Sequence, residues 1–172
     1  MNFLIDFLKN NESYLEMVSN LKSNNVPIYC NGLIKESLSH VIYSIFSDFS
    51  DKNLVLLVET ENRANELCDE LKNLIGDKVV VYPNFDIRFH NINSLETNLE
   101  NNRIEIMNKL ISKEKFIIIT TAGALSKKIS THKFFKSHYI NVDEDSEIDF
   151  EELTEKLIKM HYDRVDFVER CV

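Results

Sequence analysis

The feature that most constrains the fold of this chain is a repeated alternation of short apolar runs with longer helical patterns. The runs are rich in β-branched residues and predict strands, while the segments between them space their apolar residues three and four positions apart, as helices do. The four predicted strands are residues 26–30, 54–58, 79–82 and 116–121. Four such alternations are typical of a doubly wound α/β domain, with a parallel sheet and helices on both faces.

Several residues stand where they would typically begin, end or interrupt a predicted helix. Thr60 stands where its hydroxyl can cap the following helix, and Gly76 stands where a glycine commonly ends one. Residues 2–22 have near-helical spacing with a break at Asn10 and Asn11. The run at 54–58 is apolar throughout, which predicts a strand covered on both faces.

The stretch after the first predicted strand lies where a nucleotide-binding α/β domain keeps its phosphate loop, G-x-x-x-x-G-K-[ST]. On that template Gly32 takes the first glycine and Ser39 takes the final hydroxyl. Ser37 and Leu38 stand in place of the second glycine and the lysine. Leu38 cannot neutralise a phosphate, and Glu36 adds a negative charge beside N–H groups that would bind an anion. We therefore predict a degenerate loop that binds no ATP, and the other interpretation, a plain turn glycine, leads to the same expectation.

Composition narrows the classes of function. The 172 residues carry 20 Lys and Arg against 28 Asp and Glu, and the net charge of −8 disfavours non-specific binding to nucleic acid or to a membrane surface. No apolar run reaches the roughly 18–20 residues that span a bilayer, and the N-terminus lacks a signal-peptide pattern. Cys30, Cys68 and Cys171 are too far apart to indicate a disulfide framework or a zinc site. The expected location is the cytoplasm.

An acidic cluster between residues 143 and 155 admits two interpretations. Acidic residues in the first turn of a helix suit the helix dipole, which favours a solvated, well-capped helix. A metal-binding cluster is the alternative. The five histidines have no H-x-x-x-H spacing and no serine has the G-x-S-x-G context, so no metal site, cofactor or catalytic residue is predicted.

The segment Tyr-Pro-Asn-Phe-Asp at residues 82–86 follows the third predicted strand. With Arg88 it resembles a platform on which nucleic-acid bases stack. In the other interpretation, which we favour, its aromatic side chains close the carboxyl edge of the sheet.

The order of these motifs resembles the N-terminal, UvrB-like module of bacterial transcription-repair coupling factors. The resemblance begins near residue 24 and rests on residues 29–39, 56–67, 81–86 and 117–125, and most specifically on 162–169, Tyr-Asp-Arg-Val-Asp-Phe-Val-Glu. The last segment is similar to the GYxRVDxVE entry into the second domain, with His161 in place of the glycine. UvrB itself keeps an intact phosphate loop and a long aromatic hairpin, whereas here the lysine is missing and only residues 84–94 stand in the hairpin's place.

The resemblance implies a RecA-like fold of the P-loop type and a non-catalytic adaptor that recruits UvrA in nucleotide excision repair. ATP hydrolysis and contacts with DNA and RNA polymerase would belong to domains absent from this chain. Arg164 matches a basic residue that the family uses toward UvrA, and Arg170 is an accessory candidate. The alternative for Arg164 is a surface ion pair with Asp163 or Asp166, which contributes about 0–1 kcal/mol.

The predicted organisation is an N-terminal helical segment at residues 1–23, a partial first domain at 24–135 and the opening of a second domain at 136–172. The UvrA site would then be incomplete in this chain. Two other functions stay open: a nucleotide-dependent enzyme whose loop at Gly32 binds phosphate through backbone N–H groups, and a domain that regulates its parent protein internally.

Overall fold

The computed structural model describes residues 7–49, 51–84, 93–138, 140, 147, 149–160, 162, 163 and 165. The chain divides into two compact units, Met1–Lys127 and Lys128–Val172. Each unit is described by itself. The predicted domain limits at residues 23/24 and 135/136 remain predictions.

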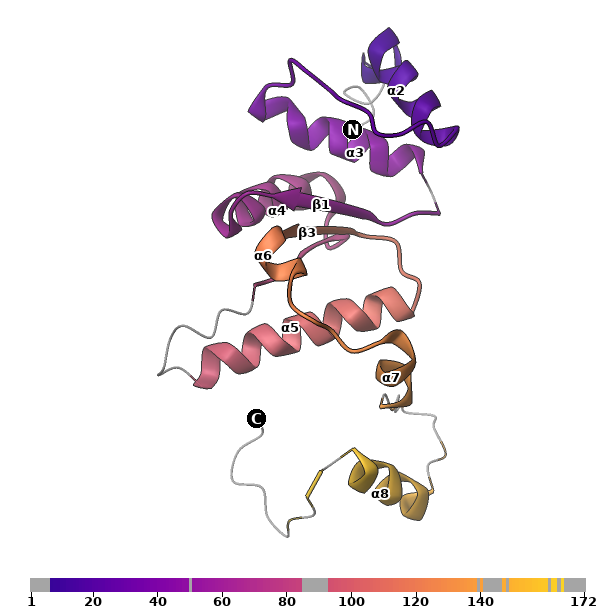
Figure 1. The fold of residues 1–172 in the computed structure, drawn as a ribbon, viewed down its shortest axis with the longest axis vertical. Helices are drawn as coiled ribbons and strands as arrows, with labels where there is room; N and C mark the ends of the chain where they lie inside the picture. The colour runs from indigo at the N-terminus through magenta and orange to yellow at the C-terminus, as the bar shows by residue number, and fades with distance from the viewer. Residues whose placement is uncertain are drawn as a thin grey trace. The chain divides into compact units, whose positions relative to one another are not determined.

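A three-stranded parallel sheet forms the centre of the first unit (Figure 1). Its strands are β1 (Leu54–Val58), β2 (Val79–Val81) and β3 (Ile117–Thr121), in the spatial order β1-β3-β2. Ile117 at the start of β3 pairs with Leu54 on one side and with Val79 on the other. All five residues of β3 are buried, as expected of a central parallel strand. The predicted α/β class with a parallel sheet is therefore confirmed.

The helices alternate with these strands. Residues 7–9 are helical, and the further elements are α2 (Glu12–Lys22), the 3₁₀ turn η1 (Lys35–Ser37), α3 (Leu38–Asp48), α4 (Glu61–Ile75), α5 (Asn93–Ile111), α6 (Ala122–Leu125), α7 (His132–Ser137) and α8 (Phe150–Lys159). The last two belong to the second unit. The spacing of Ala124, Leu125, Lys128 and Ile129 in the sequence predicts the start of a short helix, but α6 ends at Leu125. Helix α7 was not predicted.

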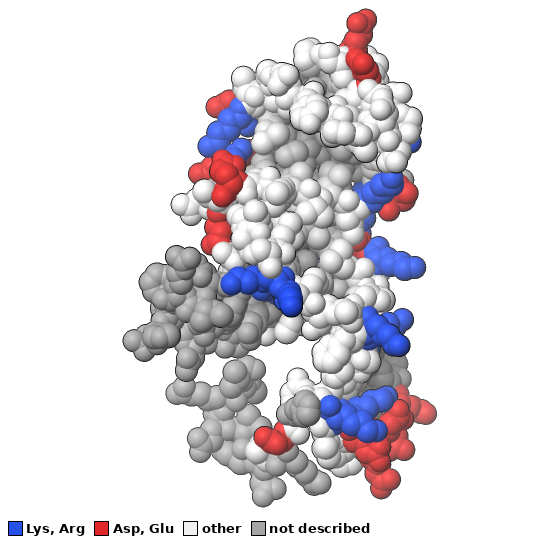
Figure 2. Space-filling view, in the orientation of Figure 1, with Lys and Arg blue, Asp and Glu red and all other residues white. Residues whose placement is uncertain are grey.

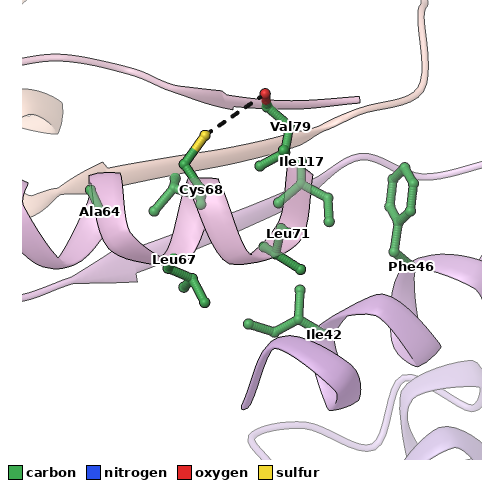
Figure 3. Packing of buried hydrophobic residues seen from close by; sticks show 9 residues of the cluster. Ile42, Phe46, Ala64, Leu67, Cys68, Leu71, Val79 and Ile117 are labelled. Atoms are coloured by element: carbon green, nitrogen blue, oxygen red, sulfur yellow. Dashed lines mark hydrogen bonds between the residues drawn. The ribbon is translucent and has the colours of Figure 1, made fainter. Parts of the chain in front are cut away.

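Helices α3 and α4 cover one face of the sheet (Figures 1 and 3). Leu67 and Leu71 of α4 are fully buried against Ile117 and Ile119 of β3, and Phe46 of α3 completes the cluster. Full burial of an aliphatic side chain stabilises a fold by about 1.5–3 kcal/mol. This face is the main core of the protein.

The second face of the sheet is covered unevenly. Ile106 of α5 packs with Ile118 of β3, but Val55 and Leu57 of β1 remain 58% and 60% exposed. The prediction that residues 54–58 are covered on both faces is therefore wrong for this face. The physical reason is that β1 lies at the edge of the sheet, beside the strand that α5 covers.

The end signals read from the sequence are confirmed. The Thr60 hydroxyl oxygen accepts a hydrogen bond of 3.2 Å from the N–H of Arg63 and caps α4. Gly76 ends the same helix with a φ of +66°, and its N–H donates to the carbonyl of Lys72. Asn11 caps α2 through the N–H of Tyr14, which explains the break in the N-terminal helical pattern.

The predicted strand at residues 26–30 is absent, and that prediction is wrong. The segment has no regular secondary structure, and the side chain of Tyr29 is 85% exposed. Pro27 has no N–H to give to a ladder, and the sheet ends at β1 within the described residues. The sequence from His138 to Val142 also suggests a further strand, and this segment lies largely outside the described residues.

Candidate functional site

The segment predicted to be a degenerate phosphate loop, residues 32–39, leads into α3 without a preceding strand. Gly32 has a φ of +82°, in the region that favours glycine, and the space around it is open. The 3₁₀ turn η1 follows, and the Ser37 hydroxyl donates a 3.0 Å hydrogen bond to the carbonyl of Ile34. Ser37 therefore holds the turn locally instead of capping α3.

The two positions that carry phosphate chemistry in an intact loop belong to the protein interior here. Leu38 packs against the main core, and Ser39 is buried at the start of α3. A lysine at position 38 would face apolar neighbours, where desolvation disfavours its charge. The sequence therefore uses these positions for packing.

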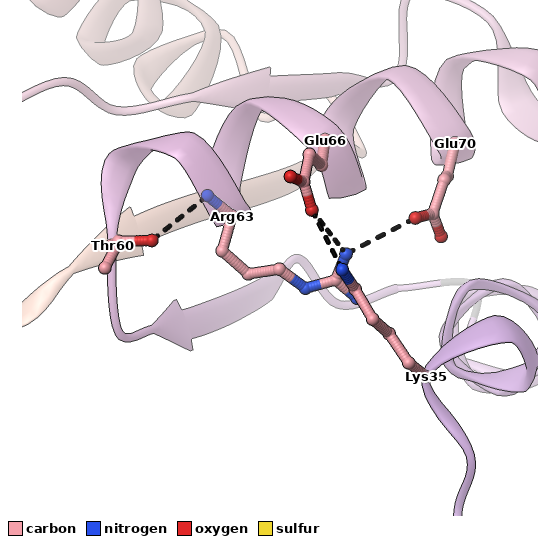
Figure 4. Close-up of polar contacts among 5 residues, drawn as sticks. All are labelled: Lys35, Thr60, Arg63, Glu66 and Glu70. Carbon is pink, nitrogen blue, oxygen red and sulfur yellow. Dashed lines mark hydrogen bonds and ion pairs between the residues drawn. The ribbon is translucent and has the colours of Figure 1, made fainter.

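The nearest loop cation, Lys35, contacts α4 (Figure 4). Its Nζ donates to Oε2 of Glu66 at 3.2 Å, and Nη1 of Arg63 donates to the same oxygen at 3.2 Å. Nη1 of Arg63 also lies 3.4 Å from Oε1 of Glu70. The hydrogen bonds from Lys35 and then Arg63 hold the pKa of the Glu66 carboxyl below its usual range.

This cluster was not predicted from the sequence. The spacing of Arg63, Glu66 and Glu70 places them on neighbouring turns of one helix, a signal that could have been read. The contribution of Lys35 could not, because it depends on how η1 meets α4.

A surface hollow of about 500 Å³ lies between α2, residues 28–33 and α3. Both polar and apolar side chains line it, and within it the thiol of Cys30 lies 3.5 Å from the sulfur of Met17. Asn11, Asn20 and Asn31 contribute amide groups, and Glu16 contributes an acidic side chain. The described residues of this lining include no Lys or Arg that could pair with a phosphate.

At the carboxyl edge of the sheet, neighbouring side chains pack and form hydrogen bonds around Tyr82. Tyr82 is buried, and the guanidinium of Arg103 lies over its ring at 4.5 Å. The hydroxyl of Thr120 donates to the Tyr82 carbonyl at 3.1 Å, and Nη2 of Arg103 donates to the carbonyl of Ala124. The expectation that the aromatic residue closes this edge is confirmed for Tyr82, whereas Phe85, Asp86 and Arg88 lie outside the described residues.

Residues that follow the three strands contact one another at the same edge of the sheet. The N–H of Asn84, after β2, donates to Oε1 of Glu61 at the start of α4. A Cβ added at Gly123, after β3, would lie 3.3 Å from Nδ2 of Asn84. Gly123 thus permits a close approach that a larger residue would crowd.

The second unit contains the acidic helix. The Asp149 side chain accepts hydrogen bonds from the N–H groups of Glu151 and Glu152, so the predicted capped helix is confirmed for α8. Glu152 also pairs with Lys156, at 2.7 Å. Arg164, Arg170 and His161 lie outside the described residues, and the roles predicted for the two arginines remain predictions.

Charge and hydropathy indicate no further site in the part of the chain that the structure describes. In the view of Figure 2, acidic and basic side chains lie side by side along the edges of the first unit, and its middle is mostly uncharged. Among the described residues, no three His, Cys, Asp or Glu side chains are grouped to hold a metal ion. Within the same residues, no helix has the length and apolar character needed to cross a bilayer.

Comparison with known proteins gives two relatives. The chain is 21% identical over 169 residues, 98% of its length, to the transcription-repair-coupling factor of Bacillus subtilis (strain 168). It is 23% identical over 164 residues, 95% of its length, to the transcription-repair-coupling factor of Staphylococcus haemolyticus (strain JCSC1435). The chain spans about 14% of the length of each relative. No protein-family model and no solved structure matches. Both relatives confirm the family resemblance read from the motif order.

Proposed function

We propose that this chain, a relative of the transcription-repair coupling factors, is a non-catalytic adaptor that takes part in recruiting UvrA during nucleotide excision repair. The observation that carries the proposal is the similarity to two coupling factors along nearly the whole chain. The motif order of a UvrB-like N-terminal module supports it. DNA translocation and contact with RNA polymerase would belong to other parts of the parent protein.

The proposed lack of ATP binding is supported by the loop. Leu38 packs in the core, Ser39 is buried, and Lys35 is paired with Glu66. An intact loop binds phosphates through a lysine and a row of free N–H groups. With the lysine replaced and the nearest cation engaged elsewhere, the loop keeps its glycine turn without the charge that a triphosphate requires.

The contact with UvrA is proposed to involve Arg164, with Arg170 as an accessory. Arginine is enriched among residues that dominate the binding energy of interfaces, because its planar guanidinium pairs with carboxylates through two parallel hydrogen bonds. The remaining part of the site would come from the rest of the second domain.

Binding to UvrA should be measured for this chain and for a version extended to complete the second domain. The proposal expects binding by the longer version, and about tenfold weaker binding for its Arg164→Ala variant, which corresponds to roughly 1.4 kcal/mol. Lys159→Ala, which removes an exposed cation of the same unit, is the matched control and should bind normally. If the extended version does not bind UvrA, the adaptor function is wrong; equal affinity for Arg164→Ala would remove only that residue.

A further inference from the structure

Two cations share one carboxylate oxygen where the degenerate loop meets α4. Nζ of Lys35 and Nη1 of Arg63 each lie 3.2 Å from Oε2 of Glu66 (Figure 4). Groups that contact the same atom lie close to each other, and two like charges at such a separation repel. The arrangement therefore depends on an anion between them.

The arginine of this pair is largely removed from water. Arg63 is 9% exposed, and its Nη2 makes no hydrogen bond within the described part of the chain. A buried guanidinium is stabilised when its remaining N–H groups find acceptors. The cluster consequently retains donor capacity beyond what Glu66 and Glu70 use.

Glu66 is easily separated from this cluster. Its side chain is 55% exposed on the surface of α4, and Lys35 is 62% exposed on η1. Neither group is fixed by packing, in contrast to Arg63. Removing the charge of Glu66 would leave the charges of Lys35 and Arg63 uncompensated, with Lys35 open to solvent and to another anion.

We propose that Lys35 and Arg63 form an oxyanion site whose resident anion is the chain's own Glu66 carboxylate, and that an inorganic oxyanion of the phosphate class takes its place when Glu66 is uncharged. A tetrahedral oxyanion offers several oxygens to the fork of Arg63 and to the ammonium of Lys35. The site needs neither UvrA nor a nucleotide. A glutamate is charged at neutral pH, and Lys35 and then Arg63 lower the pKa of Glu66 further, so the unmodified chain holds its own anion there.

The test is thermal unfolding of Glu66→Gln, which keeps the size of the side chain and removes its charge. Unfolding is followed in sodium phosphate and in sodium chloride at matched ionic strength. We expect Glu66→Gln to unfold at a lower temperature than the unmodified chain in chloride. Its Tm should then rise saturably with phosphate, as mass action requires for a ligand of the folded state. The unmodified chain should show no saturable rise of Tm with phosphate.

Two further variants identify the site. Glu155→Gln removes another exposed carboxylate, one that pairs with Lys159 at 3.4 Å on α8, and should show no phosphate response. The double variant Lys35→Met, Glu66→Gln should lose the response of Glu66→Gln.

The proposal is overturned by an equal Tm of Glu66→Gln in both salts, or by a response that persists in the double variant. An equal phosphate response in the unmodified chain would contradict the role of Glu66 as resident anion. Should Glu66→Gln prove unsuitable for unfolding experiments, Glu66→Ala removes the same charge, and phosphate binding to it can be measured directly by calorimetry.

Discussion

Two segments of this chain look alike in sequence and differ in structure. Residues 54–63 run from an apolar stretch through Thr60 into α4, and residues 26–40 run from another apolar stretch through Gly32 into α3. The first forms a strand, a turn and a capped helix. The second forms no strand, and Ser37 before α3 makes no capping hydrogen bond.

The difference shows that an apolar run forms a strand only where the backbone of a neighbouring strand is available to hydrogen-bond with it. Leu54–Val58 pairs with all five residues of β3, and its inward side chains join the main core. Residues 26–30 contain Pro27, and Tyr29 is exposed. The backbone of this segment therefore gains neither a ladder nor a covered face, and the nucleotide-loop geometry that depends on a preceding strand is absent with it.

The largest expected effect comes from a variant that breaks the packing of α4, the helix into which the first segment runs. Leu71→Ala removes a fully buried side chain of α4 and should lower the free energy of unfolding by about 2–5 kcal/mol, through lost burial and the remaining cavity. Ile34→Ala, an exposed position of the second segment, is the matched control and should stay within about 0.5 kcal/mol. Denaturant unfolding measures both. Similar losses in the free energy of unfolding for the two variants would contradict the difference between the packed helix α4 and the exposed Ile34 of the second segment.

A smaller effect separates the two helix starts. Thr60→Ala removes the hydroxyl that accepts from the N–H of Arg63 and should cost about 1 kcal/mol in the free energy of unfolding. Ser37→Ala removes a hydroxyl that donates to the carbonyl of Ile34 and should cost less than about 0.5 kcal/mol. The midpoints of denaturant unfolding measure the stability of both variants. A larger loss of stability for Ser37→Ala would mean that the hydroxyl at the start of α3 matters more than the cap at the start of α4.

The smallest effect concerns the contact of Lys35, in the second segment, with Glu66 of α4. The pKa of Glu66 is lowered in the folded chain from the ordinary value of 4.5, so its pairing with Lys35 and Arg63 stabilises the fold above that pH. The stabilisation is lost as the pH falls through the folded pKa. The stability difference between the unmodified chain and Glu66→Gln should therefore shrink as the pH falls below about 4.5. A difference that does not change with pH would show that the pairing does not contribute to stability.

The sequence predicted those parts of the fold that local chemistry decides. The strands at 54–58, 79–82 and 116–121 were found because β-branched runs alternate with helical spacing, and Thr60 and Gly76 were found because their chemistry acts within one turn. The sequence could not reveal that the sheet ends at β1, because that depends on which strands are available to pair.

The candidate site was predicted in part. Its chemical deficit, Leu38 in place of a lysine, was visible in the sequence. The engagement of Lys35 by Glu66 was not, since these residues are 31 positions apart and meet only through the packing of η1 and α3 on α4. Helix α7 was missed although Thr131 caps it, because its apolar pattern spans a single turn or little more.

The proposed lack of ATP binding is best tested by a calorimetric titration of the chain with ATP and magnesium. We expect no saturable heat, because the loop lacks its lysine, Ser39 is buried and Lys35 is paired with Glu66. Saturable binding that weakens when Gly32 is replaced by valine would contradict it. The chain would then be a nucleotide-binding domain with an atypical loop, and the proposal of a scaffold without its own ATP site would be wrong.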